Sequence, residues 1–98
     1  MKEISSNLPY GEFIHKMQKL ISKGRLAGII NFIHQEETLI IEFIKFGSSK
    51  IFYKLNLLDK GFIAYYEKES ITFTHSIFRN EIEIYLVDLI KKMGAVVK

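Results

Sequence analysis

The fold of this chain is decided by residues 26–74, LAGIINFIHQEETLIIEFIKFGSSKIFYKLNLLDKGFIAYYEKESITFT. Apolar and polar side chains alternate along this stretch, and β-branched and aromatic residues are frequent, as is typical of strands with one buried face. Short polar clusters interrupt the pattern. Five strands are therefore predicted: Leu26 to His34, Leu39 to Phe46, Lys50 to Leu57, Phe62 to Glu67 and Ile71 to Thr74.

The connections between these predicted strands are very short. They are residues 35–37, 47–49, 58–61 and 68–70. A parallel pair of strands needs a crossover of about a dozen residues or more, whereas antiparallel neighbours are joined by tight turns. The sheet is therefore predicted to be an antiparallel meander.

A helix precedes the strands. From Tyr10 onward, apolar residues recur at the three- and four-residue spacing that places them on one helix face. They are Phe13, Ile14, Met17, Leu20 and Ile21. Pro9 at the first turn and Gly24 after Lys23 are typical start and stop signals.

A second helix is predicted after Ser76, and Gly94 marks its end. Its apolar stripe consists of Phe78, Ile82, Tyr85, Leu86, Leu89 and Met93. Ile77, Ile84 and Val87 make this stripe wider than one helix face requires. We therefore expect another surface to cover these three side chains.

Together, these elements predict one α+β domain over residues 1–98, in the order α-β-β-β-β-β-α. Its five-stranded antiparallel meander would carry both helices on one face, which is a common two-layer plan. The alternative is a winged-helix fold in which residues 53–67 form the wing and a following helix. It is disfavoured because residues 24–49 are rich in β-branched and aromatic residues and contain no helix-turn-helix pattern.

The loop lengths also predict which residues face each other across the sheet. A three-residue loop after the second predicted strand places Glu42 opposite Lys54. The same argument at the neighbouring loops places Asn31 opposite Glu42 and Tyr65 opposite Lys54. Thr72 then lies opposite Tyr65 and ends the row. A cross-strand Glu–Lys pair contributes roughly 0.2–1 kcal/mol and fixes the register, so this polar row is interpreted as mainly structural.

The sheet face opposite the helices carries apolar residues beside the polar row. Monomers rarely expose a large contiguous apolar area, and burying about 500 Å² is worth on the order of 10 kcal/mol before association costs. We therefore expect a homodimer, or another protein partner, on this face. The predicted interface is Ile29, Ile40, Glu42, Ile44, Phe46, Phe52, Lys54, Ile63 and Tyr65. The alternative is a sheet that closes on itself or is covered by the second helix.

The composition excludes several kinds of chemistry. The chain contains no cysteine, which rules out disulfides, thiolate metal sites and a cysteine nucleophile. Its histidines, His15, His34 and His75, are not spaced as metal ligands, so neither a metal nor a cofactor is expected. No serine lies in a Gly-x-Ser-x-Gly motif, and no enzymatic activity is predicted.

The expected location is the cytoplasm. No apolar run approaches the roughly 20 residues of a membrane span, and the first residues lack the apolar core of a secretory signal. Abundant Ile, Lys and Phe with little Ala is typical of an AT-rich prokaryotic, archaeal or viral genome.

The favoured function is a non-enzymatic interaction or assembly module, an adaptor or a regulator, and two other classes stay open. The first is nucleic-acid binding, because the formal charge is +3 and basic residues cluster near the end of the first helix. This basic patch comprises Lys16, Lys19, Lys23 and Arg25. The second is a small-ligand site in a pocket around Glu42, Lys54 and Tyr65.

Overall fold

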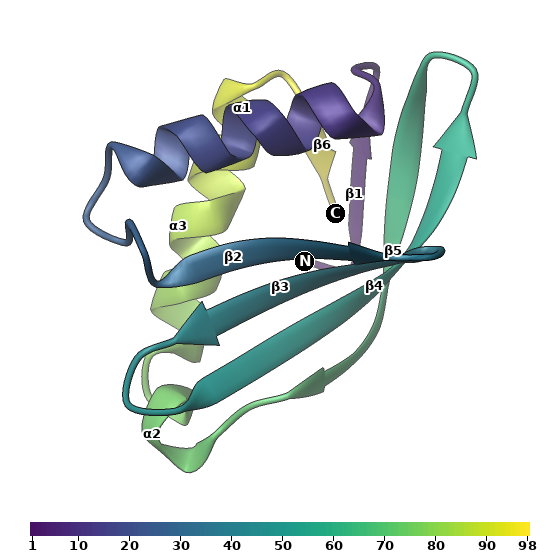
Figure 1. Cartoon of the computed structure of the whole chain (residues 1–98). Helices are drawn as coiled ribbons and strands as arrows, with labels where there is room; N and C mark the ends of the chain where they lie inside the picture. The colour runs from purple at the N-terminus through teal and green to yellow at the C-terminus, as the bar shows by residue number, and fades with distance from the viewer.

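A computed structural model of the protein covers residues 1–98 and contains three helices and six strands (Figure 1). The elements are β1 (Glu3–Ser6), α1 (Tyr10–Ser22), β2 (Ile30–Gln35), β3 (Thr38–Ile44), β4 (Ser48–Leu58), β5 (Gly61–Ser70), α2 (Phe73–Ser76), α3 (Arg79–Lys92) and β6 (Val96–Val97). All paired strands are antiparallel, in the order β2-β3-β4-β5-β1-β6. The chain is therefore an α+β domain, as predicted.

Four of the five predicted strands are confirmed as the meander β2 to β5, but the first begins at Ile30 and not at Leu26, because residues 26–29 form turns. The fifth, Ile71 to Thr74, is wrong, because β5 continues to Ser70 and the chain then enters α2. β4 is eleven residues long, and its first half offers β5 a partner as far as the Lys50–Ser70 pair. The backbone groups of residues 68–70, which were predicted to form a loop, are instead paired with β4. This pairing satisfies their hydrogen bonds, so the segment is a strand despite its polar sequence.

Two further strands extend the sheet beyond the predicted meander. β1 pairs with β5, and β6 pairs with β1. They contain only four and two residues, too few to show an alternating pattern. Ile4 of β1 is 1% exposed and joins the core. Gly94, at φ 80°, lets the chain turn from α3 into β6.

The two long helices pack on the same face of the sheet, as predicted (Figure 1). Their buried residues are Phe13, Met17 and Ile21 of α1 and Leu86, Leu89 and Ile90 of α3. They meet the inward side chains of the strands, and the ring of Phe62 lies 4.9 Å from that of Phe13 in an edge-to-face arrangement. No helix combines the length and the apolar character needed to cross a membrane.

The strand registers agree with the predicted polar row at two of its four pairs and differ at the other two. Asn31 faces Glu42, and Lys54 faces Tyr65, as predicted. Glu42, however, faces Lys50, because the β3–β4 turn is residues 45–47 instead of 47–49. The pairing is shifted by an even number of residues, so every side chain of β4 keeps its predicted face. The Lys50 ammonium lies 3.9 Å from the Glu42 carboxylate.

The predicted polar row ends before it reaches Thr72. That residue lies beyond β5, and its amide donates a hydrogen bond to Ser49 instead of facing Tyr65 across a ladder. The cause is the same as for the missing fifth strand: the turn on which the placement of Thr72 depended is part of β5.

Ion pairs fix the start of α3 against the sheet. The Arg79 guanidinium lies 3.0 Å from the Glu69 carboxylate and 3.6 Å from that of Glu83, which also pairs with the Met1 ammonium. Hydrogen bonding to Arg79 holds the pKa of Glu69 below its usual value. The Met1 ammonium does the same for the pKa of Glu83. Both carboxylates therefore favour the folded chain in their ionised form.

Candidate interaction site at the α2 end

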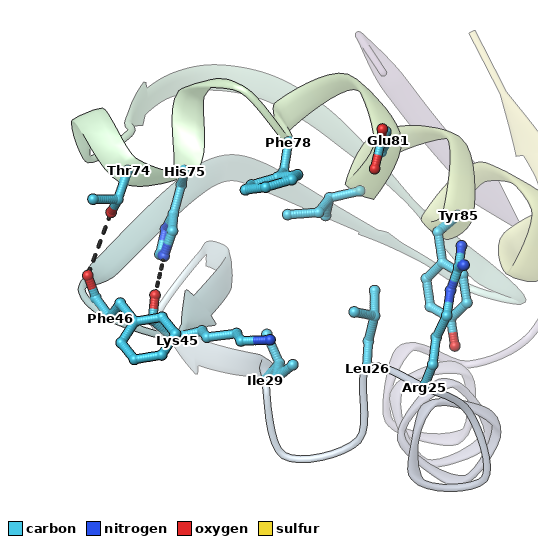
Figure 2. Close-up of a pocket in the computed structure, with 11 residues that line it drawn as sticks. Arg25, Leu26, Ile29, Lys45, Phe46, Thr74, His75, Phe78, Glu81 and Tyr85 are labelled. Carbon is cyan, nitrogen blue, oxygen red and sulfur yellow. Dashed lines mark hydrogen bonds between the residues drawn. The ribbon is translucent and has the colours of Figure 1, made fainter.

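A pocket opens at the end of the molecule where α2 lies (Figure 2). Its volume is about 490 Å³, within the range of roughly 300–1,000 Å³ that is common for binding pockets. Its apolar walls come from the loop before β2, from the β3–β4 turn, and from α3 and the residue that precedes it. They are Leu26, Ile29, Phe46, Phe78, Ile82 and Tyr85. Because these segments are distant in the sequence, no local motif encodes the pocket.

His75 joins α2 to the sheet. Its Nε2 lies 2.6 Å from the carbonyl oxygen of Lys45, and its Nδ1 lies 2.6 Å from the Ser49 hydroxyl. A carbonyl can only accept, so we assign the proton to Nε2, and the Ser49 hydroxyl then donates to Nδ1. Ser49 in turn accepts a hydrogen bond of 2.9 Å from the Thr72 amide. Each of these polar groups is therefore satisfied by a partner within the chain.

A Ser–His hydrogen bond is also a feature of nucleophilic catalysis, but this pair is enclosed. Ser49 is 0% exposed and His75 is 8% exposed. The second imidazole nitrogen is occupied by the Lys45 carbonyl instead of an orienting carboxylate. In this arrangement the pair holds α2 against β4 and the β3–β4 turn.

The β3–β4 turn holds Phe46 in a costly conformation. Phe46 has φ 55° and Gly47 has φ 138°. The left-handed region costs an L-residue roughly 1–2 kcal/mol, whereas glycine adopts it readily. The Thr74 hydroxyl donates a 3.3 Å hydrogen bond to the Phe46 carbonyl and helps to hold the turn. The Phe46 ring is nevertheless 88% exposed, so burial within the chain does not offset the cost.

Phe46 belongs to a group of exposed apolar side chains that we name the α2-end patch: Phe46, Phe73, Ile77 and Phe78. Phe73 is 88% exposed, Ile77 is 77% exposed and Phe78 is 51% exposed. Phe78 lines the pocket together with Phe46, whereas Phe73 and Ile77 lie outside it. Single exposed apolar residues are ordinary, but several of them around one pocket are typical of a binding surface.

Three charged side chains line the pocket without an ion pair inside the protein: Arg25, Lys45 and Glu81. The Arg25 guanidinium stands 5.7 Å from the centre of the Tyr85 ring. Lys45 and Glu81 lie on opposite sides of the pocket, one on the turn and the other on α3 (Figure 2). An apolar pocket with unpaired charges of both signs at its edges can bind a surface that presents the complementary pattern.

Part of the interface predicted from the sequence lies at this site. Ile29 and Phe46 line the pocket, and Ile44, at the end of β3 beside the turn, is 46% exposed. Lys45, Phe73 and Glu81 were not predicted. Phe73 was predicted to lie in the fifth strand, which does not form. One sequence signal did point to this surface. The apolar stripe of the second predicted helix is wider than one face requires, and Ile77, one of the extra residues, is largely exposed.

The other predicted interface residues lie on the outer face of the sheet. Ile40 stands between Ile33 and Phe52 in neighbouring strands and is only 5% exposed. The Lys68 ammonium lies 5.1 Å from the centre of the Phe52 ring. Ile63, on β5, is half-buried. Ile40, Phe52 and Ile63 are therefore largely shielded by their neighbours within one chain, whereas Tyr65 on the same face is 43% exposed.

The predicted ligand set of Glu42, Lys54 and Tyr65 is divided between two parts of the sheet. Lys54 and Tyr65 line a second pocket of about 560 Å³, which does not include Glu42. Glu42 instead forms an ion pair with Lys50. The structure therefore does not bring all three side chains to one place.

The predicted basic patch is also rearranged. Lys16, Lys19 and Lys23 line a groove between α1 and the end of α3, and Lys92 of α3 joins them. Arg25 lies in the pocket at the α2 end. Lys92 was missed because it comes from the other end of the sequence.

No protein-family model, curated protein or solved structure matches this chain. No group of three or more His, Cys, Asp or Glu side chains is arranged to hold a metal ion.

Proposed function

We propose that this protein is a non-enzymatic interaction and assembly module that acts as a homodimer through the α2-end patch, in the cytoplasm. The observation that carries the proposal is Phe46, whose backbone lies in a costly region while its ring is 88% exposed. Full burial of a Phe side chain is worth about 1.5–3 kcal/mol, which is enough to offset that cost. Contact with a partner supplies the burial that the single chain lacks.

A second copy of the chain is the favoured partner because the pocket edge is self-complementary in charge. Lys45 and Glu81 stand on opposite sides of the pocket, and neither has an ion-pair partner in its own chain (Figure 2). In a two-fold symmetric dimer, residue i contacts j and j contacts i. Lys45 of each copy would therefore meet Glu81 of the other while the apolar patches close against each other.

Binding is favoured over catalysis because the one Ser–His pair at the site is enclosed. Ser49 and His75, which have the right chemistry, are buried and hydrogen-bonded to backbone groups as well as to each other. The outer face of the sheet is the less favoured dimer surface, because Ile40 there already has only 5% of its surface in water.

Charge-reversal variants test the homodimer. The mass of the native chain at micromolar concentration, measured by sedimentation, should be that of a dimer. Lys45→Glu and Glu81→Lys should each raise the dimer dissociation constant by more than about tenfold, because like charges then face each other. A mixture of the two variants should form heterodimers, and the double variant should form dimers again, because both arrangements restore opposite charges.

Lys60→Glu is the matched control, since it makes the same charge change at an exposed position in the β4–β5 turn. It should leave the mass unchanged. A native chain that stays monomeric at every accessible concentration would overturn the homodimer. Dimers that persist in both single variants would place the interface elsewhere.

A further inference from the structure

The groove between α1 and the end of α3 is a second site with its own chemistry. It has a volume of about 410 Å³ and an apolar floor of Leu8, Leu20 and Met93. All its charged lining residues are lysines, namely Lys16, Lys19, Lys23 and Lys92. Lys16 and Lys19 of α1 and Lys23 at its C-cap are spaced i, i+3 and i+7, which aligns them along one side of the helix over about 10 Å.

These four lysines account for the whole positive excess of the chain. Without them, ten Lys and Arg stand against eleven Asp and Glu. Two of the four have a carboxylate neighbour, at 3.4 Å for Lys16 with Glu12 and 3.1 Å for Lys92 with Asp88, and all these side chains are at least half exposed. Exposed pairs of this kind are weak and exchange readily with other anions.

The ends of the helices do not cancel this charge. α1 ends at Ser22 and α3 ends at Lys92, so both C-termini lie near the groove. Each contributes only about half a negative charge. Lys19 and Lys23 have no carboxylate within ion-pair distance. The groove therefore keeps a net positive charge that a negatively charged partner can neutralise.

We propose that this groove binds the phosphate backbone of double-stranded nucleic acid without reading its bases. A row of lysines suits regularly spaced phosphates, which lysine contacts as a point charge. No aromatic residue lines the groove, so it lacks the stacking platform typical of single-strand binding. Its apolar residues form a half-buried floor and do not protrude, unlike the anchors of a membrane-binding helix.

The salt dependence of binding to a short DNA duplex tests this proposal. Fluorescence anisotropy should show that two duplexes of unrelated sequence bind equally. Each neutralised phosphate contributes about −0.9 to the slope of log affinity against log salt. With four lysines engaged, affinity should therefore fall by about a hundredfold between roughly 50 and 200 mM salt. The double variant Lys19→Gln, Lys23→Gln should flatten the slope by about 2, and Lys92→Gln by about 1.

Lys60→Gln again serves as the matched control, because the β4–β5 turn lies on the opposite side of the molecule from the end of α1 (Figure 1). It should leave the slope unchanged, and circular dichroism should show that all variants are folded. Absence of binding at low salt would overturn the proposal. So would equal behaviour of the groove variants and the control, preference for single strands, or a lysine-dependent affinity for phosphatidylserine vesicles that exceeds the affinity for DNA.

Discussion

The outer face of the sheet and the α2 end both carry several apolar residues, but those at the α2 end are more exposed. On the sheet, Ile40 is covered by its cross-strand neighbours Ile33 and Phe52 and is only 5% exposed. At the α2 end, Phe46 and Phe73 are each 88% exposed. Strand neighbours stand close enough to cover one another, whereas side chains on a turn and on a one-turn helix have few neighbours. Exposure thus follows from local neighbour density more than from composition.

The largest expected effect is a difference in the free energy of unfolding between one alanine variant in each region. Ile40→Ala should lower the free energy of unfolding by about 2 kcal/mol or more, because it leaves a cavity among packed neighbours. Ile77→Ala, at a position that is 77% exposed, should change it by less than about 0.5 kcal/mol. Urea unfolding of both variants at a concentration where the chain is monomeric measures the difference. Equal losses would mean that Ile77 is buried in the monomer.

The next effect concerns the link between α2 and the sheet. Ser49→Ala should lower the free energy of unfolding by about 1–3 kcal/mol, because it leaves the buried His75 Nδ1 and the partly buried Thr72 amide without partners. Hydrogen exchange should show faster opening of α2 than of β3. Ser48→Ala is the control, since the neighbouring Ser48 is exposed. An unchanged exchange rate at α2 would show that the link is dispensable.

A smaller effect, of opposite sign, is expected at Phe46. Phe46→Gly should raise the free energy of unfolding of the monomer by roughly 0.5–1 kcal/mol, since glycine removes the left-handed strain but adds entropy to the unfolded chain. The same variant should weaken the dimer. A stabilised monomer that associates less well is the signature of a residue retained for binding. A destabilised monomer would instead assign Phe46 a role in folding.

The smallest effect is a dependence on pH at the start of α3. The pKa of Glu69 is lowered in the folded chain, mainly by its hydrogen bond from Arg79. The pair therefore stabilises the fold above the usual carboxyl pKa, and this contribution is lost as the pH falls through the lower, folded value. Since Glu69 is partly exposed, the loss should be under about 1 kcal/mol. Arg79→Gln should remove this part of the acid dependence, and an unchanged profile would contradict the pairing.

The sequence predicted the site less completely than the fold. Lys16, Lys19 and Lys23 follow a helical repeat, so their common location was predictable. Lys92 was not, because it reaches them only when α3 packs beside α1. Phe73 was assigned to a strand because its neighbours are β-branched. The long β4–β5 hairpin instead leaves it on α2, outside the sheet.

The sequence by itself determined the class of fold: its two apolar periods, of about two and about 3.6 residues, identify the meander and both long helices. Only the tertiary structure decided the pairing of β1 and β6, the position of the β3–β4 turn and the assembly of the pocket. Periodicity reports which side of an element is apolar, and that is a local property of the chain. Which surfaces remain exposed depends on contacts between segments far apart in sequence, and no local pattern records those contacts.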